Sequence, residues 1–124
     1  MIRTPTFLSD AKAAGLSDEE QNHIVSDISK NPSVGAIMEG TGGCRKMRFA
    51  GRGKGKSGGF RTVHYFAGDD VPVLLLALID KGEDENLSKA ERNDLRIELN
   101  GYADDYRKGV IAQIAAHSRK RNNR

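Results

Sequence analysis

The 124-residue sequence predicts a single α+β domain with an antiparallel sheet and flanking helices, and three features carry that prediction. Two segments near the N-terminus have helical spacing, a middle region alternates as strands do, and a final segment has an apolar stripe of helical period. A chain of this length buries roughly two-thirds of the surface that its unfolded form exposes, so one domain suffices. We expect that domain to span residues 1–118, followed by a basic, disordered tail at 119–124.

Two helices are expected before the strands. Ser17–Lys30 begins with an N-cap serine and has Glu20 three residues later, the spacing of a capping box. Ser9–Ala14 predicts a shorter helix, separated from the longer one by Gly15. Thr4–Phe7 predicts a short edge strand, since its proline cannot donate to a central ladder.

The strand period first appears just after Cys44. Lys46 and Arg48 fall on one side of an extended segment, whereas Met47 and Phe49 fall on the other. We therefore expect the apolar pair to face the core and the basic pair to face away from it.

Two more strands complete the expected sheet. Arg61–Phe66 is rich in β-formers, so the glycine-rich Gly51–Gly59 segment is expected to join it to the preceding strand as a hairpin. Val71–Ile79 is nearly continuous in apolar residues, which predicts a central strand covered on both faces.

The last helix is predicted to begin at Ser88, with Glu91 completing a second capping box. Gly101 and Gly109 each favour a kink or break. One apolar stripe steps by three or four residues through Leu95, Leu99, Tyr102, Tyr106, Val110 and Ile114.

The charge distribution indicates a polyanionic partner. Net charge is only +3, yet seven of the 20 Lys and Arg residues lie in the 17-residue stretch 45–61, which contains no Asp or Glu. One concentrated cationic segment on a mildly acidic body is typical of nucleic-acid binding, although a solvated charged loop is the simpler alternative.

Other functional classes are disfavoured by composition. The longest strongly apolar run, Val73–Ile79, is far shorter than the ~20 residues that cross a bilayer, and the N-terminus has no signal-like apolar stretch. Cys44 is the only cysteine, and the three histidines lack metal-like spacing. We expect a cytoplasmic protein without membrane association, metal or cofactor.

Two phosphate-binding motifs match the sequence in residue spacing but not in the secondary structure that they require. Gly53, Gly55 and Gly58 satisfy the dinucleotide fingerprint, and Gly55, Lys56 and Ser57 resemble the end of a Walker loop. Both motifs must open a helix, whereas Arg61–Phe66 predicts a strand. We instead expect a mobile glycine loop whose amides and lysines close over phosphates.

The segment GTGGCRKMRFAGRGKGKSGGFRTVHYF resembles the signature of the HigB branch of RelE/ParE superfamily toxins. The shared pattern is kept at Gly40–Gly43, Arg45–Arg48 and Gly51–Arg61, with two extra residues in the glycine loop, and the resemblance covers about residues 7–100. It implies two N-terminal helices packed on a small curved antiparallel sheet, with a C-terminal helix.

The same resemblance implies a function. Such toxins are silenced by a cognate antitoxin that carries a DNA-binding domain, and their RNA-cutting members cleave mRNA in the ribosomal A site without a metal. The ribose 2′-hydroxyl attacks the adjacent phosphorus and leaves a cyclic phosphate. The expected function is therefore a ribosome-dependent mRNA interferase that inhibits translation.

The expected site consists of basic side chains. Arginine stays protonated, so Arg48 and Arg61 suit stabilisation of the phosphorane. Lysine normally titrates near ~10.4, but like charges nearby lower that value, so Lys46 or Lys56 is the expected base and Lys81 or Lys54 the acid. The catalytic set is Lys46, Arg48, Lys56, Arg61 and Lys81, and the RNA-binding set is Arg45, Arg52, Lys54 and Tyr65.

The general acid stays open because some relatives place Arg and then Tyr or His after the last strand, where this chain has Lys81, Gly82 and Leu87. Two other functions remain as alternatives. One is a non-catalytic RNA- or ribosome-binding module that uses the same basic hairpin. The other is inhibition of DNA gyrase, as in ParE relatives.

Overall fold

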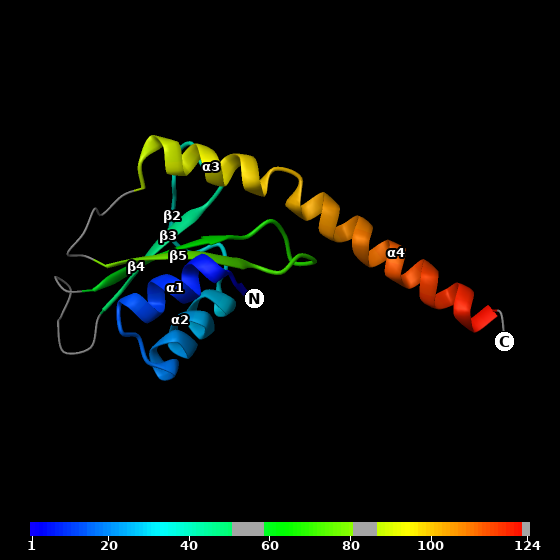
Figure 1. The fold of residues 1–124 in the computed structure, drawn as a ribbon, viewed down its shortest axis with the longest axis horizontal. Helices are drawn as coiled ribbons and strands as arrows, with labels where there is room; N and C mark the ends of the chain where they lie inside the picture. The colour runs from blue at the N-terminus through cyan, green and yellow to red at the C-terminus, as the bar shows by residue number, and fades with distance from the viewer. Residues whose placement is uncertain (51–58, 81–86, 123–124) are drawn as a thin grey trace.

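The structure is a computed structural model that describes residues 1–50, 59–80 and 87–122. Two helices cover one face of a sheet, a third lies on the other face, and a fourth extends away from the body (Figure 1). This confirms the predicted α+β class. The elements are β1 (Ile2–Arg3), α1 (Pro5–Ala13), α2 (Asp18–Lys30), β2 (Ala36–Ile37), β3 (Arg45–Phe49), β4 (Phe60–Tyr65), β5 (Leu74–Asp80), α3 (Lys89–Leu99) and α4 (Tyr102–Asn122).

The sheet has five strands in the order β1-β5-β4-β3-β2. The three long strands pair antiparallel, as predicted, but β1 pairs parallel to β5, and β2 pairs antiparallel to β3 at the opposite edge. A purely three-stranded sheet was therefore wrong. The central strand is β4 rather than the 71–79 segment, whose strand begins at Leu74 after a turn in which the Val71 amide donates to the Gly68 carbonyl at 3.3 Å.

The N-terminal prediction was wrong in detail, because Thr4 caps a helix instead of opening a strand. Its Oγ1 accepts from the Phe7 amide at 3.3 Å and donates to the Leu75 carbonyl at 3.0 Å. Pro5 occupies the first helical turn, where a missing N–H costs nothing. The first helix consequently starts at Pro5 and not at Ser9.

Both predicted capping boxes are present, at Ser17 with Glu20 and at Ser88 with Glu91. The expected break falls at Gly101, whose φ of +82° ends α3 and redirects the chain into α4. Gly109 lies within α4.

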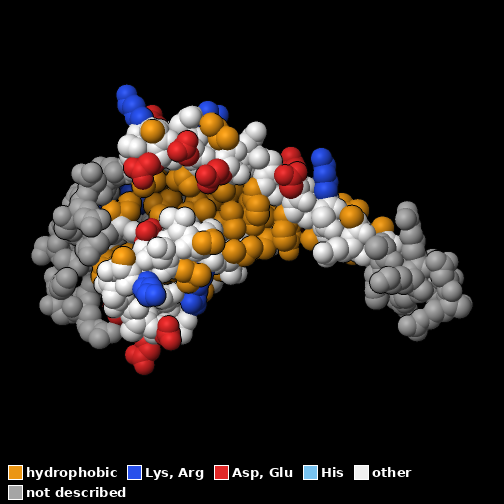
Figure 2. All heavy atoms as spheres, in the orientation of Figure 1, with side chains coloured by type: hydrophobic (Ala, Val, Ile, Leu, Met, Phe, Trp, Pro, Cys, Tyr) orange, Lys and Arg blue, Asp and Glu red, His pale blue; other side chains and the backbone are white. Residues whose placement is uncertain are grey.

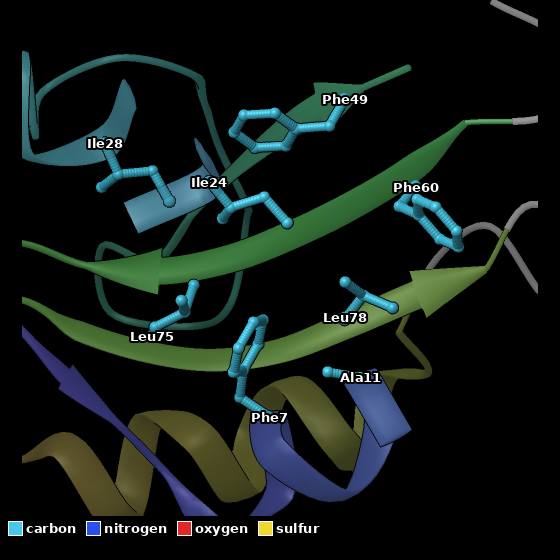
Figure 3. Packing of buried hydrophobic residues seen from close by; sticks show 8 residues of the cluster. All are labelled: Phe7, Ala11, Ile24, Ile28, Phe49, Phe60, Leu75 and Leu78. Carbon is cyan, nitrogen blue, oxygen red and sulfur yellow. The ribbon is translucent and has the colours of Figure 1, made fainter. Parts of the chain in front are cut away.

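Two hydrophobic clusters hold the layers together. The first lies between α1, α2 and the sheet (Figure 3), and it contains Phe49 and Phe60 of the sheet together with Ile24 and Ile28 of α2. The second lies on the opposite face and includes Leu99 of α3. Because β5 contributes to both clusters, the predicted two-sided burial of this strand is confirmed. The buried members are Phe7, Ala11, Ile24, Ile28, Phe49, Phe60, Leu75 and Leu78 in the first cluster, and Met38, Cys44, Val63, Leu76 and Leu99 in the second.

Among the residues whose side chains the structure describes, the polar contacts of α4 with the body lie near the start of the helix. The Tyr102 hydroxyl donates to the Pro72 carbonyl at 2.9 Å, and burial raises the pKa of that hydroxyl. The Arg107 guanidinium donates to both oxygens of Asp70, at 2.6 and 2.9 Å, and these bonds hold the carboxyl pKa below its ordinary value. This pair links the beginning of α4 to the turn before β5.

His64 is fully buried on the α2 side of β4. Its Nε2 lies 2.9 Å from the Pro32 carbonyl, which can only accept, so Nε2 carries the proton and the buried Nδ1 has no partner among the described residues. Burial lowers the pKa of the ring; the Pro32 bond opposes that shift, and the nearby Arg45 adds to it. The folded state therefore favours neutral His64.

We predict that stability falls as the pH drops below the unfolded histidine pKa of ~6.5, because the unfolded chain then takes up a proton that folded His64 resists. The loss continues to the lower folded pKa, with a slope of at most ~1.4 kcal/mol per pH unit for one proton. Urea unfolding at a series of pH values measures it. His64→Gln, which keeps a donor for Pro32, should remove this component, whereas His23→Gln on the exposed surface of α2 should retain it. Equal pH profiles for both variants would contradict the assignment.

Candidate nucleic-acid interface

The alternation predicted for β3 is confirmed. Met47 and Phe49 pack in the first cluster, on the face that α1 and α2 cover. Lys46 and Arg48 therefore project from the opposite face of the sheet. On β4, Val63 belongs to the second cluster, which places Arg61, two residues away, on that same face. Three predicted site residues thus share one surface.

The strand register brings these cations close together. Arg48 pairs directly with Arg61 across β3 and β4, a spacing of ~4.5–5.5 Å between Cα atoms. Lys46 lies two residues along the same strand, ~6.8 Å away. Like charges placed directly opposite in a sheet are destabilising, and a phosphate bound between them removes that penalty. The arrangement therefore suits an anionic ligand.

The floor beside the cations is apolar. Val63 pairs with Lys46, and Ile79 of β5 pairs with Arg61. Lys46 and Arg61 are half-buried against this floor, while Arg48 is exposed. Charges at such a boundary interact more strongly with a bound anion than charges surrounded by water do.

A glycine turn at 40–43 positions the start of β3. Thr41 is buried in it, donating to the Met38 carbonyl at 2.7 Å and accepting from the Cys44 amide at 3.0 Å. Gly40 and Gly42 have φ of +80° and +77°, which only glycine adopts easily. The turn explains in physical terms why the sequence reads GTGG before the basic strand.

Two arginines that the sequence analysis left without a role lie over this turn. Arg92 of α3 donates to the Glu39 carbonyl at 3.2 Å and to the Leu87 carbonyl at 3.1 Å. Arg96, one helical turn later, lies against Gly42 and donates to Asn93 at 2.7 Å. Their spacing of four residues on a capped helix was the available signal, but only the fold shows which loop they cover.

The structure does not gather every predicted residue. Arg45 lies on the opposite face, where its Nη1 donates to the Gly35 carbonyl at 3.1 Å and it faces His64 across the strands. Tyr65 shares the cationic face but lies four residues beyond Arg61 and is 6.3 Å, centroid to centroid, from Tyr102. Four predicted residues lie outside the described segments: Arg52, Lys54, Lys56 and Lys81.

Within residues 1–50, 59–80 and 87–122, no three His, Cys, Asp or Glu side chains form a group able to hold a metal ion. In the same segments, no helix has the length and apolar character that a membrane span requires.

The fold and this face together define a class: a small α+β protein whose sheet presents basic side chains to a polyanion. A family model described as "RelE toxin of RelE / RelB toxin-antitoxin system" matches residues 1–119. The chain therefore belongs to the RelE toxin family. Membership identifies it as the toxin type of a toxin–antitoxin pair, a family whose members typically act as ribonucleases, and it implies an antitoxin as partner.

We predict that Lys46→Ala and Arg48→Ala each weaken binding of single-stranded RNA and lower the salt dependence of the affinity. Each lost phosphate contact should reduce the slope of log K against log salt by ~0.7. Fluorescence anisotropy at several salt concentrations measures both quantities. The matched control is Lys12→Ala, which removes the same charge from α1 on the other side of the sheet. An equal loss of affinity in the control would show that net charge, not this face, governs binding.

Proposed function

We propose that the chain is a metal-independent mRNA interferase that cleaves mRNA in the ribosomal A site and thereby inhibits translation. The observation that carries the proposal is the convergence of Lys46, Arg48 and Arg61 on one sheet face. Membership of the RelE toxin family supports a ribonuclease activity. The signature at Gly40–Gly43, Arg45–Arg48 and Gly51–Arg61 supports placement in the HigB branch.

The reaction is intramolecular transesterification. The ribose 2′-oxygen attacks the adjacent phosphorus and gives up its proton, and the bond from phosphorus to the 5′-oxygen breaks. The products are a 2′,3′-cyclic phosphate and a 5′-hydroxyl end. Such a reaction needs a proton acceptor, cations around the charged phosphorane and a proton donor.

We assign the first two requirements to residues that the structure describes. Arg48 and Arg61 lie directly opposite each other, so two guanidinium groups can contact one phosphate from adjacent strands. Guanidinium stays protonated in proteins, which excludes both arginines as bases. Lys46 is the neighbouring group able to release and accept a proton, and we propose that it accepts the proton of the 2′-hydroxyl. Lys56 is the alternative base and Lys81 or Lys54 the proposed acid.

The ribosome and an antitoxin complete the functional context. We propose that the protein acts in the cytoplasm and that mRNA held in the A site is its substrate. A cognate antitoxin with a DNA-binding domain is the proposed inhibitor, and acidic side chains that cover the cationic face would block substrate most directly.

Primer extension on mRNA after a short pulse of expression tests whether mRNA is cleaved. Assays of the purified protein with and without ribosomes test whether cleavage depends on the ribosome. Arg61→Ala and Lys46→Ala should each reduce cleavage, by ~10²–10³-fold where a transition-state contact is removed. Lys12→Ala should cut at the normal rate. Normal cleavage by Arg61→Ala would overturn the assignment.

The remaining outcomes separate the alternative functions. Cleavage of naked mRNA at the same rate would contradict ribosome dependence. Arrested translation with intact mRNA would identify a non-catalytic binding module. Arrested replication with intact mRNA would favour gyrase inhibition.

A further inference from the structure

The charges of α3 fall on two separate flanks of the helix. Since successive residues turn by ~100°, its basic residues share one arc and its acidic residues share another. The basic residues are Lys89, Arg92 and Arg96, and the acidic residues are Glu91, Asp94 and Glu98. Between the two arcs, Leu95 and Leu99 pack in the second cluster against the sheet. The helix therefore presents opposite charges on its two sides.

This segregation does not stabilise the helix itself. Asp94 and Glu98 are like charges four residues apart, as are Arg92 and Arg96, and such pairs weaken an isolated helix. Within Lys89–Leu99, no acidic residue lies three or four positions from a basic one. A ligand of opposite charge on each flank would relieve both repulsions.

The acidic flank faces a groove between α3 and the start of α1. The groove has a volume of about 380 Å³, and all three acidic residues of α3 line it together with residues 4–6. The basic flank instead lies over the glycine turn at 40–43, where Arg96 lies against Gly42. The two flanks of α3 therefore face different surfaces of the molecule.

The rest of the groove is apolar or uncharged. Its apolar lining comes from Leu76 and Ala77 of β5 together with Leu87 and Leu95. Within the part of the chain that the structure describes, no Lys or Arg lines it. Figure 2 shows acidic side chains of α3 along the upper edge of a hydrophobic band that lies between α3 and α1. Exposed apolar surface bordered by charge is typical of a protein-binding surface.

We propose that this groove binds a segment of the antitoxin that combines apolar side chains with Lys or Arg. Family membership implies an antitoxin as partner. The acidic wall attracts a cationic segment and repels the phosphates of RNA. Apolar side chains of that segment would lie against β5 while its basic side chains reach Asp94 and Glu98. This contact is separate from the acidic one proposed for the cationic face, and it rests on family membership rather than on RNA cleavage.

Calorimetric titration of the full chain with its purified antitoxin tests the charge contact. Asp94→Lys combined with Glu98→Lys reverses the acidic wall and should weaken the complex at least tenfold. The matched control combines Asp69→Lys with Asp105→Lys, which makes the same charge change at exposed positions outside the groove and should leave the affinity unchanged. Circular dichroism establishes that both variants are folded.

A second pair of variants tests the groove without changing charge. Thr6 is exposed on α1 and lines the groove, so Thr6→Trp should fill it and weaken the complex at least tenfold. Ser9→Trp places the same side chain on the same helix outside the groove and should bind normally. Equal losses within either pair of variants would overturn the proposal.

Cross-linking identifies the occupant. Ala90 is exposed beside the acidic flank, one turn before Asp94, so Ala90→Cys can carry a photoreactive label there. The native Cys44 is buried and does not compete for the label. Mass spectrometry of the illuminated complex should find an antitoxin peptide that contains Lys or Arg beside apolar residues. A peptide without a basic residue, or a peptide from a second copy of this chain, would contradict the assignment. None of these measurements depends on RNA cleavage.

Discussion

The pairing of Phe49 with Phe60 is the constraint on which the proposed site depends. These residues lie opposite each other on β3 and β4, and both are buried against the helices α1 and α2. Because strand side chains alternate between faces, a slip of one residue would turn the aromatic pair outward and the cations inward. The hydrophobic core therefore fixes the register that sets Arg48 beside Arg61 on the other face.

The two faces of the sheet carry different side chains. The face under α1 and α2 holds the first cluster together with the buried His64. The other face combines basic side chains with the apolar residues of the second cluster. Like charges directly opposite each other, such as Arg48 and Arg61, weaken strand pairing, and the packed core behind them offsets that cost. This is the pattern expected where a binding site is built at a cost in stability.

Strand alternation and helix capping, which depend on residues close together in the sequence, were predictable from the sequence. Alternation placed Lys46 and Arg48 on one face of β3. The same rule puts Arg45 with Met47 on the face that α1 and α2 cover, and the structure has it there. Capping boxes located the starts of two helices. The two-residue strands β1 and β2 are too short to show a period, and the parallel pairing of β1 with β5 joins residues about 70 positions apart. Those features depend on tertiary contacts that no local pattern records.

The break at Gly101 sets where α4 lies relative to the face that carries Lys46, Arg48 and Arg61. It directs α4 away from the sheet at the end of β4 near Tyr65, where Tyr65 and Tyr102 meet. Arg61 lies at the other end of that strand, ~13 Å along it. The cations of the proposed site and the start of α4 therefore lie at opposite ends of β4.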